Sequence, residues 1–441
     1  MNRFFVLACM GKFAYASWKS IAGYQPGSKV TDHNAIDLDQ KAIEIALSQA
    51  TINYQDVYKI YSEGGNSKAY AKFTVNALAV DLKKKSKVVG SKSGIQGSLK
   101  ADFKKDATEI EVLYPVSESQ ELYVDCKVGA LSPVPAGKVA AAYEPYQYKN
   151  KCFQNEVLQV TTNGSIVSLN ATAEPTNKAG RTLRGFSTKA GDLMFNKGDK
   201  GCKGASNRVG DGCPYLDFTM YKNYYGIMDY ADKLVSAAIN AKKTGFTTAD
   251  ANMDFGDANV IGKAVLRKEV IKKGTAYMNA YMYAIREFED AIDDCKAGCA
   301  NGIVSTGTGC NKFSTDAVHA WDEGVAFYTG SLEGPAAGGN TAGVFSYRLA
   351  EKRCANFKTC GKESNSVSGV SYVNIQLFEK LSIGQAKLLV GQCEAVRPVL
   401  RDMVALMSIP LIQGTLRYAY KIDKMSGGGK EKGEGAIFAA A

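Results

Sequence analysis

The chain has 441 residues, a formal net charge of +10, 45% hydrophobic residues and 22% charged residues. These values are typical of a folded globular protein with room for one large domain or several smaller ones. No apolar run reaches the roughly 18 residues that a membrane-spanning helix needs. The lysines are scattered, without a basic stripe interleaved with aromatics, so the positive charge indicates a solvated surface and no nucleic-acid partner.

Residues 1–16 have the pattern of a secretory signal peptide. Arg3 supplies the positive start, Phe4 to Met10 form a short apolar core, and Ala14-Tyr15-Ala16 match an A-x-A cleavage site. We therefore expect a secreted protein, located in a periplasm or at a cell surface.

Residues 17–205 are predicted to combine helices with short strands. The spacing of apolar residues is helical from Ile36 to Val80, with a turn at residues 63–67. Residues 107–130 alternate between apolar and polar side chains, and residues 156–190 have the pattern of short strands separated by turns. The first half of the chain should therefore hold a β-containing segment.

Residues 206–425 are predicted to be helical, which makes the fold class α+β and predominantly α-helical. Pro398 and Pro410 should kink or divide the last helix. The glycine- and lysine-rich residues 426–441 indicate a flexible tail, in which Ala436 to Ala439 could begin a hydrophobic anchor; membrane contact is expected only through such an anchor. The expected helices are Tyr221–Ala241, Val260–Ile271, Gly274–Cys295, Thr315–Thr329, Gly343–Phe357 and Ile375–Asp423.

Two short segments echo one another along the chain. Tyr54 to Tyr61 and Trp321 to Tyr328 each have an aromatic start, one or two acidic residues and a closing tyrosine, and each precedes a glycine-containing turn. An ancient duplication would explain the similarity. Chance similarity between two amphipathic helices explains it almost as well.

The cysteine count also indicates an oxidising compartment. Of 11 cysteines, Cys9 lies in the signal peptide, which leaves an even set that suits disulfides. A zinc site is the alternative, but no C-x-x-C pair occurs and the chain has only two histidines. N-x-S/T sequons at Asn163 and Asn170 predict N-glycosylation. The predicted disulfide cysteines are Cys126, Cys152, Cys202, Cys213, Cys295, Cys299, Cys310, Cys354, Cys360 and Cys393.

The segment from Lys272 to Cys295 carries the most candidate chemistry in the chain. At about 100° per residue, one face is apolar, and the other combines a phenol, a guanidinium and carboxylates at Tyr283, Arg286, Glu287 and Asp290. Ferric iron is a hard cation that prefers anionic oxygen donors, and an arginine could neutralise a co-bound carbonate. The alternative is a solvated acidic face in which Arg286 pairs with Asp290 at i,i+4.

A second candidate set is Asp316, His319 and Glu323. Their spacing of three and four residues places all three on one side of a helix. Carboxylates and an imidazole could form a mixed oxygen and nitrogen metal site. A histidine near acids is, however, usually an ordinary surface or capping residue.

A third candidate set is Tyr221, Tyr225 and Asp232, which align on one helical face. A tyrosine stripe is also the usual pattern of core packing, with the hydroxyls at its rim. One metal site assembled from all three helices is the most attractive hypothesis, although the sequence does not establish that they converge.

Several long segments resemble a known family, the algal low-iron-inducible periplasmic proteins, which are also described as high-carbon-dioxide-inducible. The phytotransferrins of marine algae are similar to them. The resemblance covers most of the chain, from about Ala35 to Lys424. The segments that carry it are Ala179–Thr188 (AGRTLRGFST), Cys213-Pro214-Tyr215, Tyr224-Tyr225-Gly226, Asp229-Tyr230-Ala231-Asp232, Lys273–Cys295 and Ala320–Gly334 (AWDEGVAFYTGSLEG).

This resemblance implies a role in iron assimilation outside the cell, which in the phytotransferrins depends on carbonate. It supplies no established ligand set. We expect a non-catalytic protein that captures Fe(III), with carbonate as a co-ligand, for iron-uptake machinery at the cell surface. No serine-hydrolase elbow, Walker A loop or zincin motif argues for an enzyme. The alternative is a cell-surface or structural protein that is induced by iron or carbon dioxide status and binds no metal.

Overall fold

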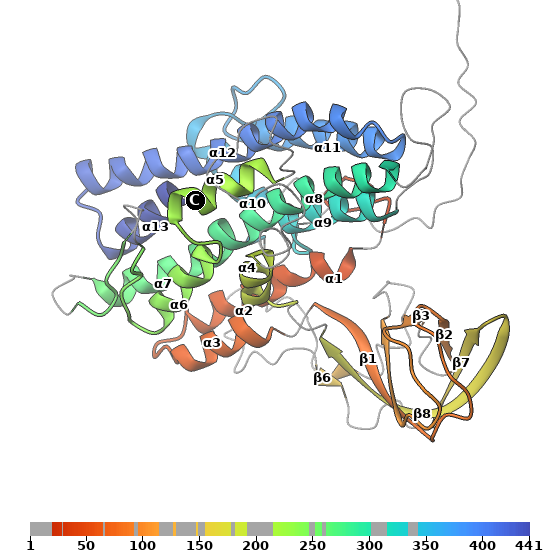
Figure 1. The fold of residues 1–441 in the computed structure, drawn as a ribbon. Coiled ribbons are helices and arrows are strands. Elements are labelled where there is room, and N and C mark those ends of the chain that lie inside the picture. Colours follow the sequence, from red (N-terminus) through yellow and green to blue (C-terminus); the bar gives the residue numbers. More distant parts are fainter. Residues whose placement is uncertain are drawn as a thin grey trace, which may run out of the picture.

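The computed structural model describes residues 20–28, 30–64, 67–91, 96–113, 127–128, 147–148, 155–177, 181–191, 215–246, 252–257, 262–300, 315–333 and 343–441. They form a helical body with a β-barrel to one side of it (Figure 1). Each part has its own hydrophobic core. The predicted class, α+β with a predominance of helices, is confirmed. The predicted signal peptide lies outside the described residues.

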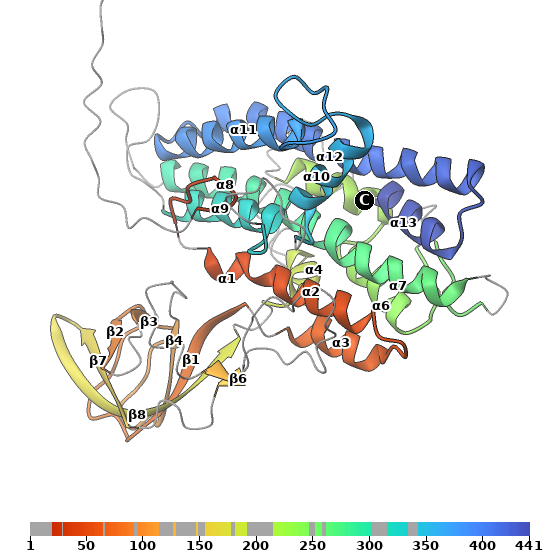
Figure 2. The same ribbon diagram turned by 180° about the vertical axis from the view of Figure 1, so that it is seen from behind.

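The barrel is a closed antiparallel sheet, seen from behind in Figure 2. Its neighbouring strands follow the order β1-β4-β3-β2-β7-β8, and closure leaves no free strand edge. Alternate residues point inward, so that Phe73 of β1 lies opposite Ile110 of β4 in the core. The strands are β1 (Lys68–Val75), β2 (Lys87–Gly90), β3 (Gln96–Leu99), β4 (Glu109–Leu113), β7 (Glu156–Thr162) and β8 (Ser165–Asn177), with β5 (Lys127–Val128) and β6 (Gln147–Tyr148) as a separate pair.

Both predicted glycosylation sequons lie on the β7–β8 hairpin. Asn163 and Gly164 have φ values of 48° and 78°, as the two central residues of a type I′ turn require. Asn163 and Asn170 are both exposed. Their amides are therefore accessible, and glycosylation stays a prediction.

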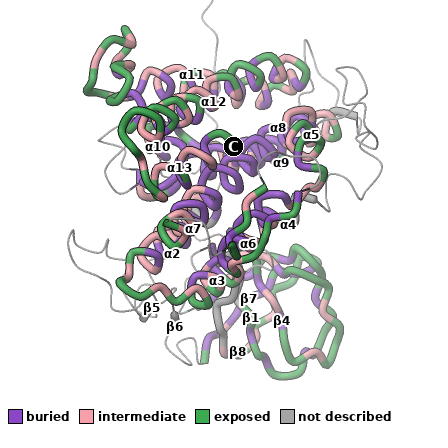
Figure 3. Tube along the Cα trace, turned by 90° about the vertical axis from the view of Figure 1, so that its left-hand side faces the viewer, coloured by how far each residue is buried: buried purple, intermediate pink, exposed green. Residues whose placement is uncertain are grey.

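Within the described ranges, the helical body is built from α-helices and one π-helical segment. Figure 3 shows buried residues along α8 and α9 at its centre. The helices are α1 (Thr31–Asn34), α2 (Ile36–Ala46), α3 (Tyr54–Glu63), α4 (Leu183–Gly191), α5 (Leu216–Tyr225), α6 (Tyr230–Ile239), α7 (Lys263–Lys273), the π-helix η3 (Gly274–Ala280), α8 (Tyr281–Ala300), α9 (Thr315–Thr329), α10 (Ser346–Phe357), α11 (Tyr372–Leu389), α12 (Cys393–Lys424) and α13 (Gly429–Ala440).

The central pair of helices, α8 and α9, packs closely because of one glycine. A Cβ atom at Gly324 would lie 2.5 Å from the ring of Phe288, a distance that no real side chain tolerates. The missing side chain lets α9 approach α8 at the turn that carries Glu323. The close packing therefore positions the polar residues of both helices.

The structure differs from the predicted elements at several places. The predicted helix Tyr221–Ala241 is divided into α5 and α6 after Gly226, which has a φ of 73°, and residues 183–191 form α4 instead of a strand. The helical pattern predicted up to Val80 ends at α3, and Lys68 to Val75 form strand β1 instead. Pro398 and Pro410 lie inside one continuous helix, α12, and the chain breaks earlier, at Gly391, which has a φ of 69°. The expected flexible tail forms α13, which buries Ile437 and Phe438 in the core.

Two disulfides between the predicted cysteines are described. Cys295–Cys393 joins α8 to α12, and Cys354–Cys360 closes a short loop after α10. Five other predicted cysteines and the side chain of Cys299 lie outside the described residues: Cys126, Cys152, Cys202, Cys213 and Cys310. None of the helices described here is long and apolar enough to cross a membrane.

Candidate metal centre

Two imidazoles meet one carboxylate between helices α1 and α9. Nε2 of His33 lies 3.0 Å from Oε1 of Glu323, and Nε2 of His319 lies 2.9 Å from the same oxygen. A nitrogen and an oxygen that both carry lone pairs approach this closely only with a proton or a cation between them. His33, His319 and Glu323 each offer one ligand atom, and these atoms lie within 4.8 Å of one another.

The site opens toward solvent on the side of His319. The side chain of His319 is 39% exposed, whereas those of Glu323 and His33 are 13% and 4% exposed. An ion could therefore reach the carboxylate past His319, while His33 forms the inner wall.

A serine holds His319 in a defined orientation. Oγ of Ser28 donates to Oδ2 of Asp322 at 2.8 Å and lies 3.1 Å from Nδ1 of His319. The hydroxyl has one proton, so once this is donated to the carboxylate it accepts from the imidazole. Nδ1 of His319 then carries a proton, and Nε2 faces Glu323, to which it donates when it is also protonated. Without that proton, Nε2 would offer its lone pair to a bound metal ion, as metal-ligating histidines do.

The predicted polar face of α8 is buried rather than solvated. Tyr283, Arg286 and Glu287 all lie in the interior. Arg286 donates from Nη1 to Glu287 at 2.6 Å and from Nη2 to Asp290 at 3.1 Å. Asp290 also accepts a hydrogen bond from Tyr215. The predicted i,i+4 pair between Arg286 and Asp290 is present. The alternative interpretation of this face as solvated is wrong, because Tyr283, Arg286 and Glu287 are buried.

The α8 and α9 groups influence one another electrostatically. Burial raises the pKa of Glu287 to about 8, with Arg286 opposing the shift and Glu323 adding to it. Burial alone would also raise the pKa of Glu323, but His33, His319 and the half-buried Arg181 together lower it well below its usual range. Apart from Asp316, the first two predicted sets thus belong to one connected network of charges.

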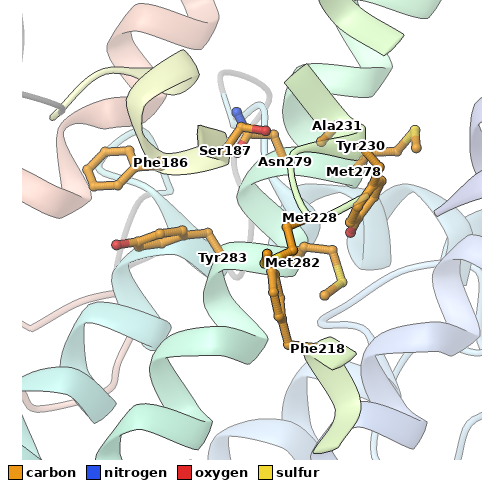
Figure 4. A pocket seen from close by; sticks show the side chains of 10 residues that line it. All are labelled: Phe186, Ser187, Phe218, Met228, Tyr230, Ala231, Met278, Asn279, Met282 and Tyr283. Carbon is orange, nitrogen blue, oxygen red and sulfur yellow. The ribbon is translucent and has the colours of Figure 1, made fainter. Parts of the chain in front are cut away.

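Tyr283 links this network to an aromatic wall. Its hydroxyl donates to Glu287, and its ring lies 4.7 Å from the rings of both Phe186 and Phe327, measured between centroids. Figure 4 shows the hydroxyl pointing away from Met282 and from a cavity of about 10 Å³ on the other side of the ring. Burial raises the pKa of Tyr283 well above its usual value, so the phenol stays neutral unless a cation binds it.

The third predicted set lies elsewhere. The hydroxyl of Tyr225 donates to the backbone oxygen of Ala440, and its ring stacks on Tyr230 at 4.4 Å. Asp232 is 3.2 Å from Nε of Arg184 and accepts from Ser236 at 2.9 Å. Tyr225 therefore serves core packing, and Asp232 an ion pair between α4 and α6. The structure does not bring this set to the group around Glu323.

Asp316, the remaining member of the second set, is exposed on the first turn of α9. Another acidic group, Asp290, Asp293 and Asp294, also has carboxylate oxygens within 4.8 Å of one another. Asp290 is already engaged by Arg286 and Tyr215. An acidic cluster of this kind is common at protein surfaces, so we do not treat it as the metal centre.

Two residues of the network were not among the predicted site residues. In the sequence, His33 stands out only as one of two histidines, and Arg181 occurs only inside a segment that carries the family resemblance. The scarcity of histidine was a usable signal, because both histidines of the chain converge on one carboxylate.

Comparisons with protein-family models, with curated proteins and with solved structures found no match to this chain.

Proposed function

We propose that this protein captures ferric iron outside the cell and passes it to uptake machinery at the cell surface. The observation that carries the proposal is the convergence of His33 and His319 on one oxygen of Glu323. Two imidazoles and a carboxylate are a recurrent ligand set for ferrous iron and leave coordination positions open. Tyr283 and Glu287 are the nearby oxygen donors that would favour the ferric ion.

The same network offers a place for carbonate. Arg286, which the sequence suggested as the anion contact, is already held by two carboxylates. Arg181 lies close enough to Glu323, Tyr283 and Glu287 for each of them to affect its pKa. We therefore assign the contact with a carbonate co-ligand to Arg181. An arginine fork can bind such an oxyanion through two hydrogen bonds.

The family resemblance supports the same role. Low-iron-inducible periplasmic proteins would need the secreted location, disulfides and glycosylation that the sequence predicts. Two disulfides are present among the described cysteines.

In this role the protein would bind and release iron without catalysing a reaction. The ancient duplication proposed for α3 and α9 stays a hypothesis.

The alternative function is that of a cell-surface or structural protein without metal. Under that hypothesis, the histidines and Glu323 form only a partly buried cluster that holds α1 on α9. The ligand set also suits zinc or ferrous iron. The experiment must therefore compare metals as well as variants.

The test is equilibrium binding of Fe(III), supplied as its citrate complex, to purified protein with and without bicarbonate. We expect one iron per chain, tighter binding with bicarbonate, and weaker binding of Zn²⁺. Glu323→Gln removes the shared anionic ligand and should weaken iron binding at least about tenfold. Asp316→Asn changes an exposed carboxylate on the same helix and should bind iron like the wild type.

The outcomes separate the hypotheses. A wild-type protein that binds no iron at micromolar concentration, with or without bicarbonate, would refute iron capture and favour the structural role. Tighter binding of Zn²⁺ than of Fe(III) would leave the site in place but give it a different metal.

A further inference from the structure

The outer side of α12 exposes a stripe of large apolar residues. Its inner side buries Met403, Met407 and Leu411 in the helical core. On the opposite side, Ile412, Leu416 and Tyr420 are 55%, 57% and 61% exposed. A spacing of four residues places these three on one face of the helix. Scattered apolar side chains are normal on a protein surface, but a contiguous stripe marks an interaction site.

The stripe continues into a groove between α12 and the end of α10. The groove has a volume of about 420 Å³ and includes Leu416 and Tyr420 of the stripe. Phe357 and Met425 extend its apolar lining, and both are exposed. Figure 1 shows α12 along the upper edge of the helical body, away from the barrel. The apolar surface is therefore open to a large partner.

The charges around the groove are positive. Arg417 and Lys421 line it, and no acidic residue does within the described part of the chain. The nearest acid in sequence, Asp423, is 2.8 Å from the ammonium of Lys424. The surface thus combines apolar and aromatic side chains with cations, which is the composition of helices that lie on anionic membranes.

We propose that the outer stripe of α12, with its basic groove, docks on an anionic lipid surface. The charge pattern favours this partner over a second copy of the chain. A two-fold symmetric dimer brings the same patch of both copies together, so Arg417 and Lys421 would face their own counterparts. A lipid surface instead supplies phosphates for the cations and an apolar interior for Leu416 and Tyr420. The stripe shares no residue with the metal centre, so this proposal does not depend on iron binding.

The test is flotation of the full chain with vesicles. One set contains phosphatidylcholine alone, and the other contains phosphatidylcholine with about one third phosphatidylglycerol. At about 0.05 M salt we expect at least about tenfold more binding to the anionic vesicles, and a large loss of binding at about 0.5 M salt because salt screens the attraction. Leu416→Glu should lower binding at least about tenfold, since it places an acid where an apolar side chain would insert.

Two further variants complete the experiment. Lys421→Glu should reduce the preference for anionic vesicles. Ile166→Glu changes a side chain that is 65% exposed on the barrel and should bind like the wild type. Failure of the wild type to bind anionic vesicles, or equal binding by Leu416→Glu, would overturn the proposal. A wild-type dimer in light scattering that Leu416→Glu dissociates, without vesicle binding, would also overturn it and assign the stripe to self-association.

Discussion

Glu323 is the residue at which the chemistry of the protein converges. One of its oxygens meets an imidazole from α1 and an imidazole from its own helix. The pairing with His319 followed from the i,i+4 spacing in the sequence. The contact with His33 did not, because a contact between residues so far apart in the chain has no local periodicity. Burial of the α8 acids was also not predictable from their polarity.

Tyr283 should give the iron-loaded protein a visible colour if its phenolate binds the metal. A cation lowers the pKa of a bound phenol enough to remove its proton, and iron–phenolate pairs absorb visible light. Tyr283→Phe should abolish the band in an absorption spectrum of the loaded protein. Tyr225→Phe is the matched control, because Tyr225 hydrogen-bonds to a backbone oxygen elsewhere in the core. A band that survives Tyr283→Phe would remove this tyrosine from the ligand set.

Glu333 should make the protein less stable as the pH rises. Burial and the neighbouring Asp37 raise the pKa of Glu333 from 4.5 to about 8. The folded state therefore holds a proton that the unfolded state has lost, so stability is full below about pH 4.5 and falls as the pH rises toward 8.

Glu333→Gln should remove this dependence. Between pH 5 and pH 8, the wild type should lose stability relative to the variant. The difference between their unfolding free energies should grow by at most about 1.4 kcal/mol per pH unit. Denaturant unfolding at several pH values measures the difference, with the exposed Glu363→Gln as the control. Parallel curves for wild type and Glu333→Gln would contradict the assignment.

At the scale of elements, the sequence predicted most where periodicity is local and strong. The limits of α9, Thr315 and Thr329, coincide with those expected, and the apolar face of α8 is buried as predicted. The sequence analysis predicts a helix where strand β1 lies, because the helical pattern extends across the turn at residues 63–67. The strands that pair with β1 are β4 and β8, which lie far along the chain, so no local pattern indicates the pairing. The division predicted at Pro398 and Pro410 is absent from the described helix, since α12 continues through both prolines.

Gly324 should be intolerant of even a methyl group. An added Cβ would meet the ring of Phe288 at 2.5 Å, and overpacking of this kind costs about 1–3 kcal/mol. Gly324→Ala should lower the unfolding free energy by about that amount and weaken iron binding, because α9 carries His319 and Glu323. Gly428→Ala is the control, since a Cβ there meets nothing within 4 Å. Equal stability of both variants would show that α8 and α9 can separate freely.

At the scale of the whole molecule, the two hydrophobic cores indicate two units that can unfold separately. One core lies inside the barrel, and the other runs through the helices that carry His33, His319 and Glu323. The sequence predicted a β-containing first half but not a closed barrel, because closure depends on pairing between strands distant in sequence, such as β1 with β8. The barrel contributes no residue to the group around Glu323.

Phe73→Ala should therefore destabilise the barrel alone. Phe73 is fully buried in the barrel core, and the loss of such a side chain costs about 3–5 kcal/mol. Differential scanning calorimetry should show one transition shifted to lower temperature and the other unchanged, with iron binding retained. A single transition that shifts as a whole would mean that the two units unfold together.

The location of iron can be measured by diffraction from crystals grown with Fe(III) and bicarbonate, with data collected at the iron absorption edge. We predict one strong anomalous peak about 2 Å from Nε2 of His33, Nε2 of His319 and a carboxylate oxygen of Glu323. A peak at Asp290, Asp293 and Asp294 instead, or no peak in the crystals grown with iron, would contradict the assignment of the metal centre.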